Sequence, residues 1–188
     1  YYNILSIVKK LIFFKLLIFF CFFNNLYPLV ESEVFPELVY KSALKEANLE
    51  RLEQLLEEGQ SSSKIDSDKM TPLAYAVKNN NKKMIELLLQ YKANINSVFL
   101  EKITPLLYSV MLEKSELIKF LVDKGADLNF QDSMGRTSIM IAVERENVNS
   151  VKELISLGAD QDILDYSGRS VHDYAKFSRK SEIRKLFK

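Results

Sequence analysis

Residues 71–76 read TPLAYA, and this register returns at an unbroken step of 33 residues. The three later copies read TPLLYS at 104–109, TSIMIA at 137–142 and SVHDYA at 170–175. A second marker keeps the same step, and its four copies read GQS at 59–61, KAN at 92–94, GAD at 125–127 and GAD at 158–160. Two markers in constant register over four units indicate an internal structural repeat.

The first marker has the chemistry of a helix start. The side chain of Thr71, Thr104 or Thr137 is suited to accept a hydrogen bond from an amide group of the first helical turn. Pro72 and Pro105 follow the threonine at a position where a missing amide proton costs nothing. Each unit is therefore expected to open with a short helix.

The second marker has the chemistry of a helix stop. Residues 84–89 and 117–122 carry apolar side chains at helical spacing, which predicts a second helix in each unit. Gly125 and Gly158 then end that helix, because glycine adopts the left-handed backbone conformation without steric penalty. The turn sequence DSMG at 132–135 predicts a hairpin-like projection before the next helix start.

A 33-residue unit with these TPLxxA and GAD markers resembles the ankyrin repeat, and the resemblance covers about residues 33–188. It implies an all-α solenoid of four to five helix-turn-helix units with short hairpin loops. One unit of this size cannot bury its apolar face alone, so the units must stack. The resemblance also implies a concave surface lined by hairpin tips and first helices. The expected units span about 33–65, 66–98, 99–131, 132–164 and 165–188.

The sequence departs from the family pattern at several positions. Lys69 and Lys102 stand in place of the turn glycine, which predicts that the first two hairpins are less regular than the last two. Residues 36–61 lack the TPL marker and carry many charges, which predicts an end cap whose outer face meets water. The family often carries a histidine that forms an internal hydrogen bond, and the residues at that position here are Ala74, Leu107, Met140 and Asp173.

Residues 1–32 form a separate, apolar segment, expected to be a helix ahead of the repeats. A spanning helix needs about 20 mainly apolar residues. Lys15 leaves residues 16–23 as the longest uncharged stretch between residues 4 and 23. A secretory signal needs a basic start, an apolar run of roughly 7 to 15 residues and a small-residue cleavage site. Residues 9–10, 11–23 and 30–32 supply these three parts, in that order.

A cleaved signal is therefore the favoured interpretation, with export to a periplasm-like space or secretion. Two alternatives stay open, namely a retained membrane anchor at residues 4–23 and an upstream region assigned to the chain in error, since it begins with Tyr1 rather than Met. A lipoprotein signal through Cys21 is disfavoured, because Phe19 and Phe20 stand where such signals carry small residues.

The composition of the remaining chain argues against several functions. Residues 33–188 carry 23 basic and 24 acidic groups, which is too even a balance for nucleic-acid binding by bulk charge. Cys21 is the single cysteine and His172 the single histidine, so neither a thiolate nor a paired-histidine metal site is expected. His172 is predicted to be a partly buried residue of the end cap. With no glycine-rich phosphate loop either, no enzyme activity and no cofactor are expected.

The hairpin-tip and inner-helix positions differ between units. They are mostly polar in three units, whereas the second repeat carries an apolar cluster at residues 98–112. Contiguous exposed apolar surface usually marks a binding site, and methionine adapts readily to partners. We therefore predict a protein-binding face in this unit. Its cluster is Val98, Phe99, Leu100, Ile103, Met111 and Leu112, flanked by Met70, Met134, Arg136 and Tyr166.

The alternative is that Phe99 and Leu100 fold back onto their own irregular hairpin, because Lys102 replaces the turn glycine. The expected function is that of a monomeric, non-catalytic scaffold, exported and bound to a partner protein through its concave face. The sequence is similar to those of small secreted ankyrin-repeat proteins of intracellular bacteria. A membrane-tethered adaptor that retains residues 4–23 is the alternative function.

Overall fold

The computed structural model describes residues 36–100 and 102–188, and within these ranges it contains ten α-helices in five consecutive pairs and no strand. The predicted all-α class is confirmed for this part of the chain, while the predicted N-terminal helix lies outside it. No helix in the described ranges combines the length and apolar character needed to cross a membrane. The helices are α3 Pro36–Glu46, α4 Leu49–Glu57, α5 Pro72–Lys78, α6 Lys82–Gln90, α7 Pro105–Met111, α8 Ser115–Asp123, α9 Ser138–Glu144, α10 Val148–Ser156, α11 Val171–Lys176 and α12 Ser181–Leu186.

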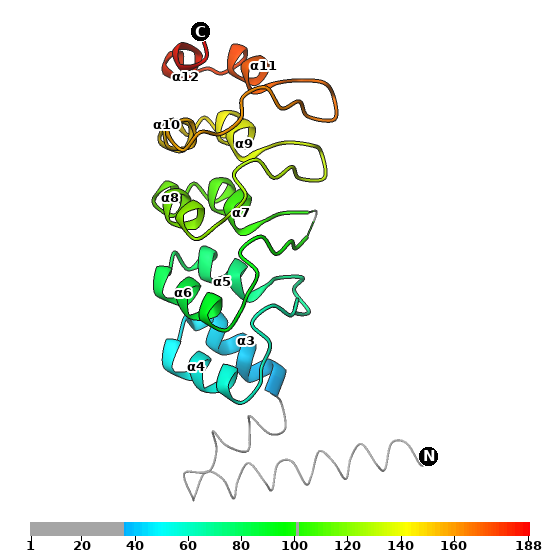
Figure 1. The fold of residues 1–188 in the computed structure, drawn as a ribbon, viewed down its shortest axis with the longest axis vertical. Coiled ribbons are helices and arrows are strands. Elements are labelled where there is room, and N and C mark those ends of the chain that lie inside the picture. Colours follow the sequence, from blue (N-terminus) through cyan, green and yellow to red (C-terminus); the bar gives the residue numbers. More distant parts are fainter. Residues whose placement is uncertain (1–35, 101) are drawn as a thin grey trace, which may run out of the picture. The chain divides into compact units, whose positions relative to one another are not determined.

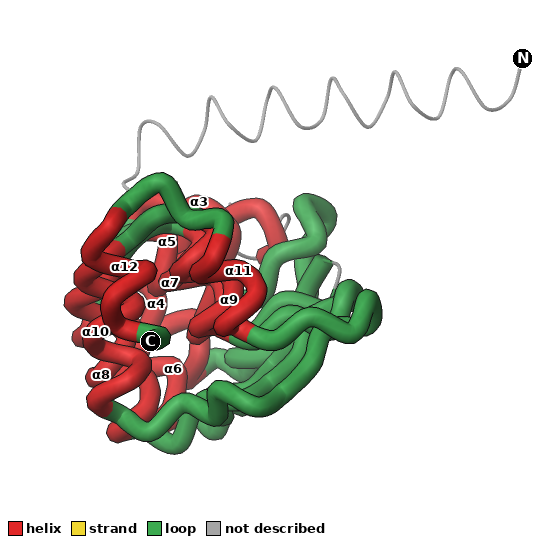
Figure 2. Tube along the Cα trace, turned by 90° about the horizontal axis from the view of Figure 1, so that it is seen from above, coloured by secondary structure: helices red, strands yellow, loops and turns green. Residues whose placement is uncertain are grey.

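Residues 43–188 form one compact unit that holds the repeats. The first helices of the repeats, α5, α7, α9 and α11, pack side by side, and each is covered by its own second helix (Figure 1). Seen along the stack, the loops that precede the first helices gather on one side of the helices (Figure 2). Each fully buried aliphatic side chain contributes ~1.5 to 3 kcal/mol relative to exposure. Side chains that are completely buried between the units include Leu88, Leu106, Val110, Ile139 and Val151.

The predicted threonine caps form in two units and fail in the third. The hydroxyls of Thr71 and Thr104 accept hydrogen bonds from the amides of Ala74 and Leu107 at 3.2 and 3.3 Å. The ψ angle rises from 157° at Thr71 to 164° at Thr104 and 168° at Thr137. The hydroxyl of Thr137 makes no cap bond, so that predicted cap is wrong.

The last unit caps its first helix differently. Asp173, at the position of the family's histidine, accepts hydrogen bonds from both the amide and the hydroxyl of Ser170 at 3.0 Å. In the same unit the ring of His172 packs edge-on against that of Phe187, with centroids 5.6 Å apart. His172 is partly buried, as predicted.

Asparagine residues that the sequence analysis did not single out organise the second helices and join the units. Asn81 and Asn147 cap α6 and α10 through their side-chain oxygens. Between units, the amide of Asp127 donates to the side chain of Asn96 at 2.8 Å, and 33 residues later Asp160 donates to Asn129 at 3.0 Å. The aspartate of the GAD marker therefore marks an inter-unit bond as well as a helix stop.

The first hairpin is as regular as the last two, so the predicted irregularity is wrong there. Lys69 adopts a left-handed φ of 58°, and its amide donates to the carbonyl of Asp66 at 3.0 Å. Gly135 makes the equivalent bond to Asp132 at 3.1 Å. A lysine tolerates this conformation because the aspartate closes the loop around it. The second hairpin does differ, as predicted, and its geometry is described with the candidate surface.

The third repeat has a polar residue at a core position. Ser150 is completely buried where the equivalent residues are Met84, Leu117 and Ile183. Within the described residues its hydroxyl has no hydrogen-bond partner. A buried hydroxyl without a partner is unfavourable, because it has lost its bonds to water.

We therefore expect Ser150→Ala to raise the free energy of unfolding by about 1 kcal/mol, since an unsatisfied buried group costs roughly 1–3 kcal/mol. Ser109→Ala is the matched control, because Ser109 is equally buried but donates to the carbonyl of Leu106 at 2.7 Å. The control should lose about 1 kcal/mol in urea denaturation. Equal losses in the two variants would contradict the prediction.

Candidate protein-binding surface

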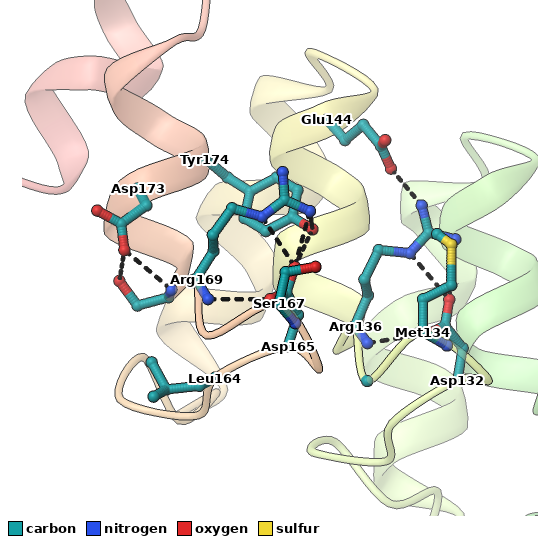
Figure 3. A network of polar contacts seen from close by, with 12 residues as sticks. Asp132, Met134, Arg136, Glu144, Leu164, Asp165, Ser167, Arg169, Asp173 and Tyr174 are labelled. Atoms are coloured by element: carbon teal, nitrogen blue, oxygen red, sulfur yellow. Dashed lines mark hydrogen bonds and ion pairs between the residues drawn. The ribbon is translucent and has the colours of Figure 1, made fainter.

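Three of the four hairpins begin with an aspartate whose carboxylate closes the loop. In the fourth, Oδ1 of Asp165 accepts from the amides of Ser167 and Arg169 at 2.8 and 2.9 Å. Its Oδ2 accepts from the hydroxyl of Tyr174 at 2.7 Å, which ties the hairpin to α11 (Figure 3). The aspartates that close the first and third hairpins with the same two amide bonds are Asp66 and Asp132.

The carboxylate of Asp165 stays ionised in this setting. Burial opposes its ionisation, but hydrogen bonds from the Arg169 amide, the Tyr174 hydroxyl and the Arg169 guanidinium outweigh burial and lower the pKa of Asp165 to about 2. Burial and the bond to Asp165 raise the pKa of Tyr174 to about 12. The Arg169 guanidinium also lies over the Tyr174 ring, 4.7 Å from its centroid. The three side chains thus form one closed polar network.

Arg136, predicted to flank the binding face, is committed to the third hairpin. Its Nε and Nη2 donate to Asp132 at 3.0 and 2.9 Å, and its Nη1 donates to Glu144 at 2.7 Å (Figure 3). Its side chain is 19% exposed. A guanidinium already held by two carboxylates is a structural group, so Arg136 is a poor candidate for partner contact and this part of the prediction is corrected.

Phe99, predicted to be at the centre of the binding face, is a core residue. It stands 33 residues after Asp66 and 33 before Asp132, at the hairpin-closing position. Its amide and carbonyl exchange hydrogen bonds with Ile103 at 3.0 and 2.9 Å. Its ring packs edge-on against Tyr108, with centroids 5.1 Å apart, and the residue is 2% exposed. A ring–ring contact therefore replaces the carboxylate–hydroxyl bond of the first and fourth units.

Leu100, the next residue, points outward. It is 52% exposed and has a φ of 46°, which is a strained value for leucine. The carbonyl of Leu100 accepts from the amide of Lys102 at 3.0 Å, which fixes the tight turn. Phe99 thus folds back onto its own hairpin, whereas Leu100 stays at the surface, and contact of Leu100 with a partner stays a prediction.

Among the other predicted contact residues, some are buried and others are exposed. Met70 is buried, because a methionine has no charged group to keep in water, unlike Arg136 and Arg169 at the same register position. Met70 is therefore withdrawn as a contact residue. Ile103 and Met111 are partly buried. The predicted residues that remain exposed are Val98, Leu100, Leu112, Met134 and Tyr166.

Exposed apolar side chains are confined to one region of the repeats. In the described part of residues 43–188, every large exposed hydrophobic residue lies in a loop before a first helix or at the end of a first helix. None lies on α4, α6, α8, α10 or α12. The loop residues are Ile65, Val98, Leu100, Met134, Leu164 and Tyr166, and the helix-end residues are Leu112 and Phe177. We call this set of eight residues the hairpin face.

Phe177 is the most exposed of these residues, at 86%, and the sequence analysis did not select it. It lines an open pocket of about 350 Å³ together with Val143, Glu144, Arg169 and Tyr174. A usable signal was present, because Phe177 stands two repeats after Met111 in the same register. It was passed over because the fourth unit is mostly polar at the compared positions.

Tyr166 is exposed but held in place. It is 68% exposed, and its amide donates to the carbonyl of Met134 at 3.0 Å, which joins the third and fourth hairpins. Its ring lies against Gly135, where an added Cβ would come within 2.5 Å of the Tyr166 Cδ1 atom. Glycine is therefore required at position 135 by this contact, since Lys69 adopts the same left-handed conformation at the equivalent position. The result is a large, fixed aromatic group at the surface.

No group of three or more histidine, cysteine, aspartate or glutamate side chains within residues 36–100 and 102–188 is arranged to hold a metal ion. The paired helices and stacked hairpins instead define a helical repeat protein. A family model described as ankyrin repeats (3 copies) matches residues 3–99, 41–132 and 95–165, which is more than half of the sequence. The chain belongs to the ankyrin-repeat family, whose repeats are generally protein–protein interaction modules. No curated protein matches the sequence.

The depressed pKa of Asp165 predicts a pH-dependent contribution to stability. At pH 7, Asp165→Asn should lower the free energy of unfolding by about 1.5–3 kcal/mol, the range for hydrogen bonds to charged groups. An unfolded aspartate has a pKa of about 3.9. The folded value is about 2, so the contribution is present above pH ~4 and is lost as the pH falls toward 2. The difference between wild type and variant in denaturant titrations should therefore shrink from pH 5 to pH 2.5. A constant difference would show that the ionised carboxylate is not responsible.

Proposed function

We propose that this protein is a non-catalytic, monomeric scaffold that binds a partner protein through the hairpin face on the concave side of its repeats. The observation that carries the proposal is the confinement of large exposed hydrophobic residues to the loops and ends of the first helices. Stacking of the units does not require these residues, since the completely buried core lies elsewhere. Apolar groups that are exposed and gathered on one face favour association with another protein.

The fixed geometry of these side chains supports the same proposal. Tyr166 is anchored by its own amide and by Gly135, and Leu100 sits in a turn closed by a backbone hydrogen bond. A side chain that is already ordered loses less entropy when a partner binds, and tyrosine and methionine are favoured at interface centres. Tyr166 and Met134 lie on neighbouring hairpins joined by that same bond, so they form a ready contact patch.

We expect the double substitution Leu100→Ser and Tyr166→Ser to abolish capture of the partner from a lysate of the source cells. Both side chains are exposed, so the melting temperature should change by less than about 3 °C, as is usual for surface substitutions. The readout is quantitative mass spectrometry of proteins retained by the immobilised chain.

The control for this test is Lys83→Ser with Lys119→Ser, which alters exposed positions on the second helices α6 and α8. The control should retain the partner. Capture that survives the hairpin substitutions, or that is lost in the control, would place binding on another surface.

We further propose that the repeats are exported, with residues 1–32 serving as a cleaved signal. The proposal is supported by the basic start, the apolar run and the small-residue site of this segment. Mass spectrometry of the protein isolated from its native cells should find an N-terminus near Glu33. An intact N-terminal segment in the membrane fraction would instead support a tethered adaptor.

A further inference from the structure

The junctions between successive repeats differ in the polar bonds that cross them. Between the first and second repeats, the side chain of Asn80 donates a hydrogen bond to Glu116 at 2.7 Å. Lys124, at the end of α8, donates to Glu86 of α6 at 2.9 Å. This junction is therefore bridged by polar bonds at a turn and between the second helices, in addition to the apolar core.

The junction between the second and third repeats lacks such bridges. Among the described residues, no hydrogen bond or ion pair joins α7, α8 or their turn to α9, α10 or their turn. In the part of the chain that the structure describes, polar bonds cross this junction only in the loops, where Asn96 bonds to Gly125 and Asp127. Lys102 also lies over the Phe130 ring, 5.4 Å from its centroid. Packing of α7 on α9 and of α8 on α10 supplies the remaining attachment.

The third and fourth repeats are bridged at their turns, second helices and hairpins. Glu146, in the turn between α9 and α10, accepts hydrogen bonds from the hydroxyl of Ser178 and the amide of Arg179, both at 2.8 Å. Lys152 of α10 forms an ion pair with Glu182 of α12. The backbone bond between the two hairpins, described above, adds a third link. Polar bonds therefore tie the fourth repeat to the third at more places than they tie the third to the second.

The third repeat also contains unsatisfied polar groups. Within the described residues, three buried hydroxyls have no hydrogen-bond partner, namely those of Thr137, Ser138 and Ser150. Where Ser138 stands, the first two repeats carry proline, and where Ser150 stands they carry methionine and leucine. Each such hydroxyl lowers the folding equilibrium constant of its repeat by about five-fold or more. The stability of a stacked repeat is the sum of its own stability and its contacts with neighbours, so the third repeat depends strongly on the fourth.

We propose that the third and fourth repeats, residues 132–188, open and close as one conformational unit while the first two repeats stay folded. A third repeat without the fourth keeps its unsatisfied hydroxyls and loses the bonds of Glu146, so it unfolds together with its neighbour. The unit contains half of the residues of the hairpin face, and its opening withdraws them from the surface. These residues are Met134, Leu164, Tyr166 and Phe177.

Native-state hydrogen exchange of the full chain tests this proposal, because it measures the opening of each helix under conditions that favour the folded state. Exchange is followed by mass spectrometry of proteolytic peptides at low urea concentrations. The opening equilibrium constants of α9, α10, α11 and α12 should agree within about two-fold and should exceed those of α5 to α8 at least about ten-fold. The measurement needs no partner, so its outcome is independent of the proposed function.

Ser150→Ala distinguishes a joint unit from fraying of the last repeat alone. The substitution removes an unsatisfied hydroxyl from the third repeat only. If the two repeats open together, exchange should slow about five-fold in α11 and α12 as well as in α9 and α10. If the last repeat frays alone, α11 and α12 should exchange at the wild-type rate. Ser138→Pro, which introduces the residue of the first two repeats, should slow exchange in the same four helices.

Ser109→Ala is the matched control, because Ser109 lies in α7 and its hydroxyl donates to the carbonyl of Leu106. This substitution should speed exchange in α7 and α8 and leave α9 to α12 within about two-fold of wild type. Four outcomes would overturn the proposal: unequal opening of the third and fourth repeats, unchanged exchange in α11 and α12 with both third-repeat substitutions, protection of α9 to α12 equal to that of α5 to α8, or faster exchange of α9 to α12 in the control.

Discussion

The conformation of each hairpin depends on the contact between its first residue and the first helix of the same unit. Where that residue is aspartate, one carboxylate accepts two amide groups of the loop, and in the first and fourth repeats it also accepts a tyrosine hydroxyl from the helix. A single side chain thus sets both the loop conformation and its attachment. Because the loops carry most of the exposed apolar residues, the candidate binding face depends on buried polar bonds beneath it.

The second hairpin is attached to its first helix by a different kind of contact. Phe99 replaces the carboxylate and packs against Tyr108, which keeps the loop attached by burial of two rings. The phenyl ring of Phe99 offers no carboxylate to the loop amides, so the amide of Ile103 donates to the Phe99 carbonyl instead. The bond from the Phe99 amide to the Ile103 carbonyl has an equivalent in each of the other three hairpins. Leu100 is left-handed and exposed, and the residues at the same register position in the other hairpins, Ser67, Ser133 and Tyr166, are exposed as well. The apolar character of this tip therefore comes from Leu100 itself.

The periodicity of the sequence predicts the helices, because caps, glycine stops and apolar spacing are local features that recur in register. The periodicity could not predict that Phe99 is buried and Leu100 exposed. Two adjacent apolar residues in a loop are equivalent until the direction of the backbone is known. The regular first hairpin was missed for a related reason. Lys69 adopts the left-handed conformation typical of glycine because Asp66 closes the loop around it. That bond cannot be predicted from the conformational preference of lysine. Phe177 was missed because the compared positions of its unit are mostly polar, and the unit as a whole was judged polar.

The core residues and the exposed apolar residues occupy different parts of the repeats. The completely buried side chains lie between helices, where each unit covers its neighbour, so the outward residues of the loops are free to vary without loss of the stack. Tyr166 is nevertheless held in place at the surface. A backbone hydrogen bond joins it to the third hairpin, and its ring lies in close contact with Gly135. Apolar groups held this way remain in place without a partner and need little ordering when one arrives.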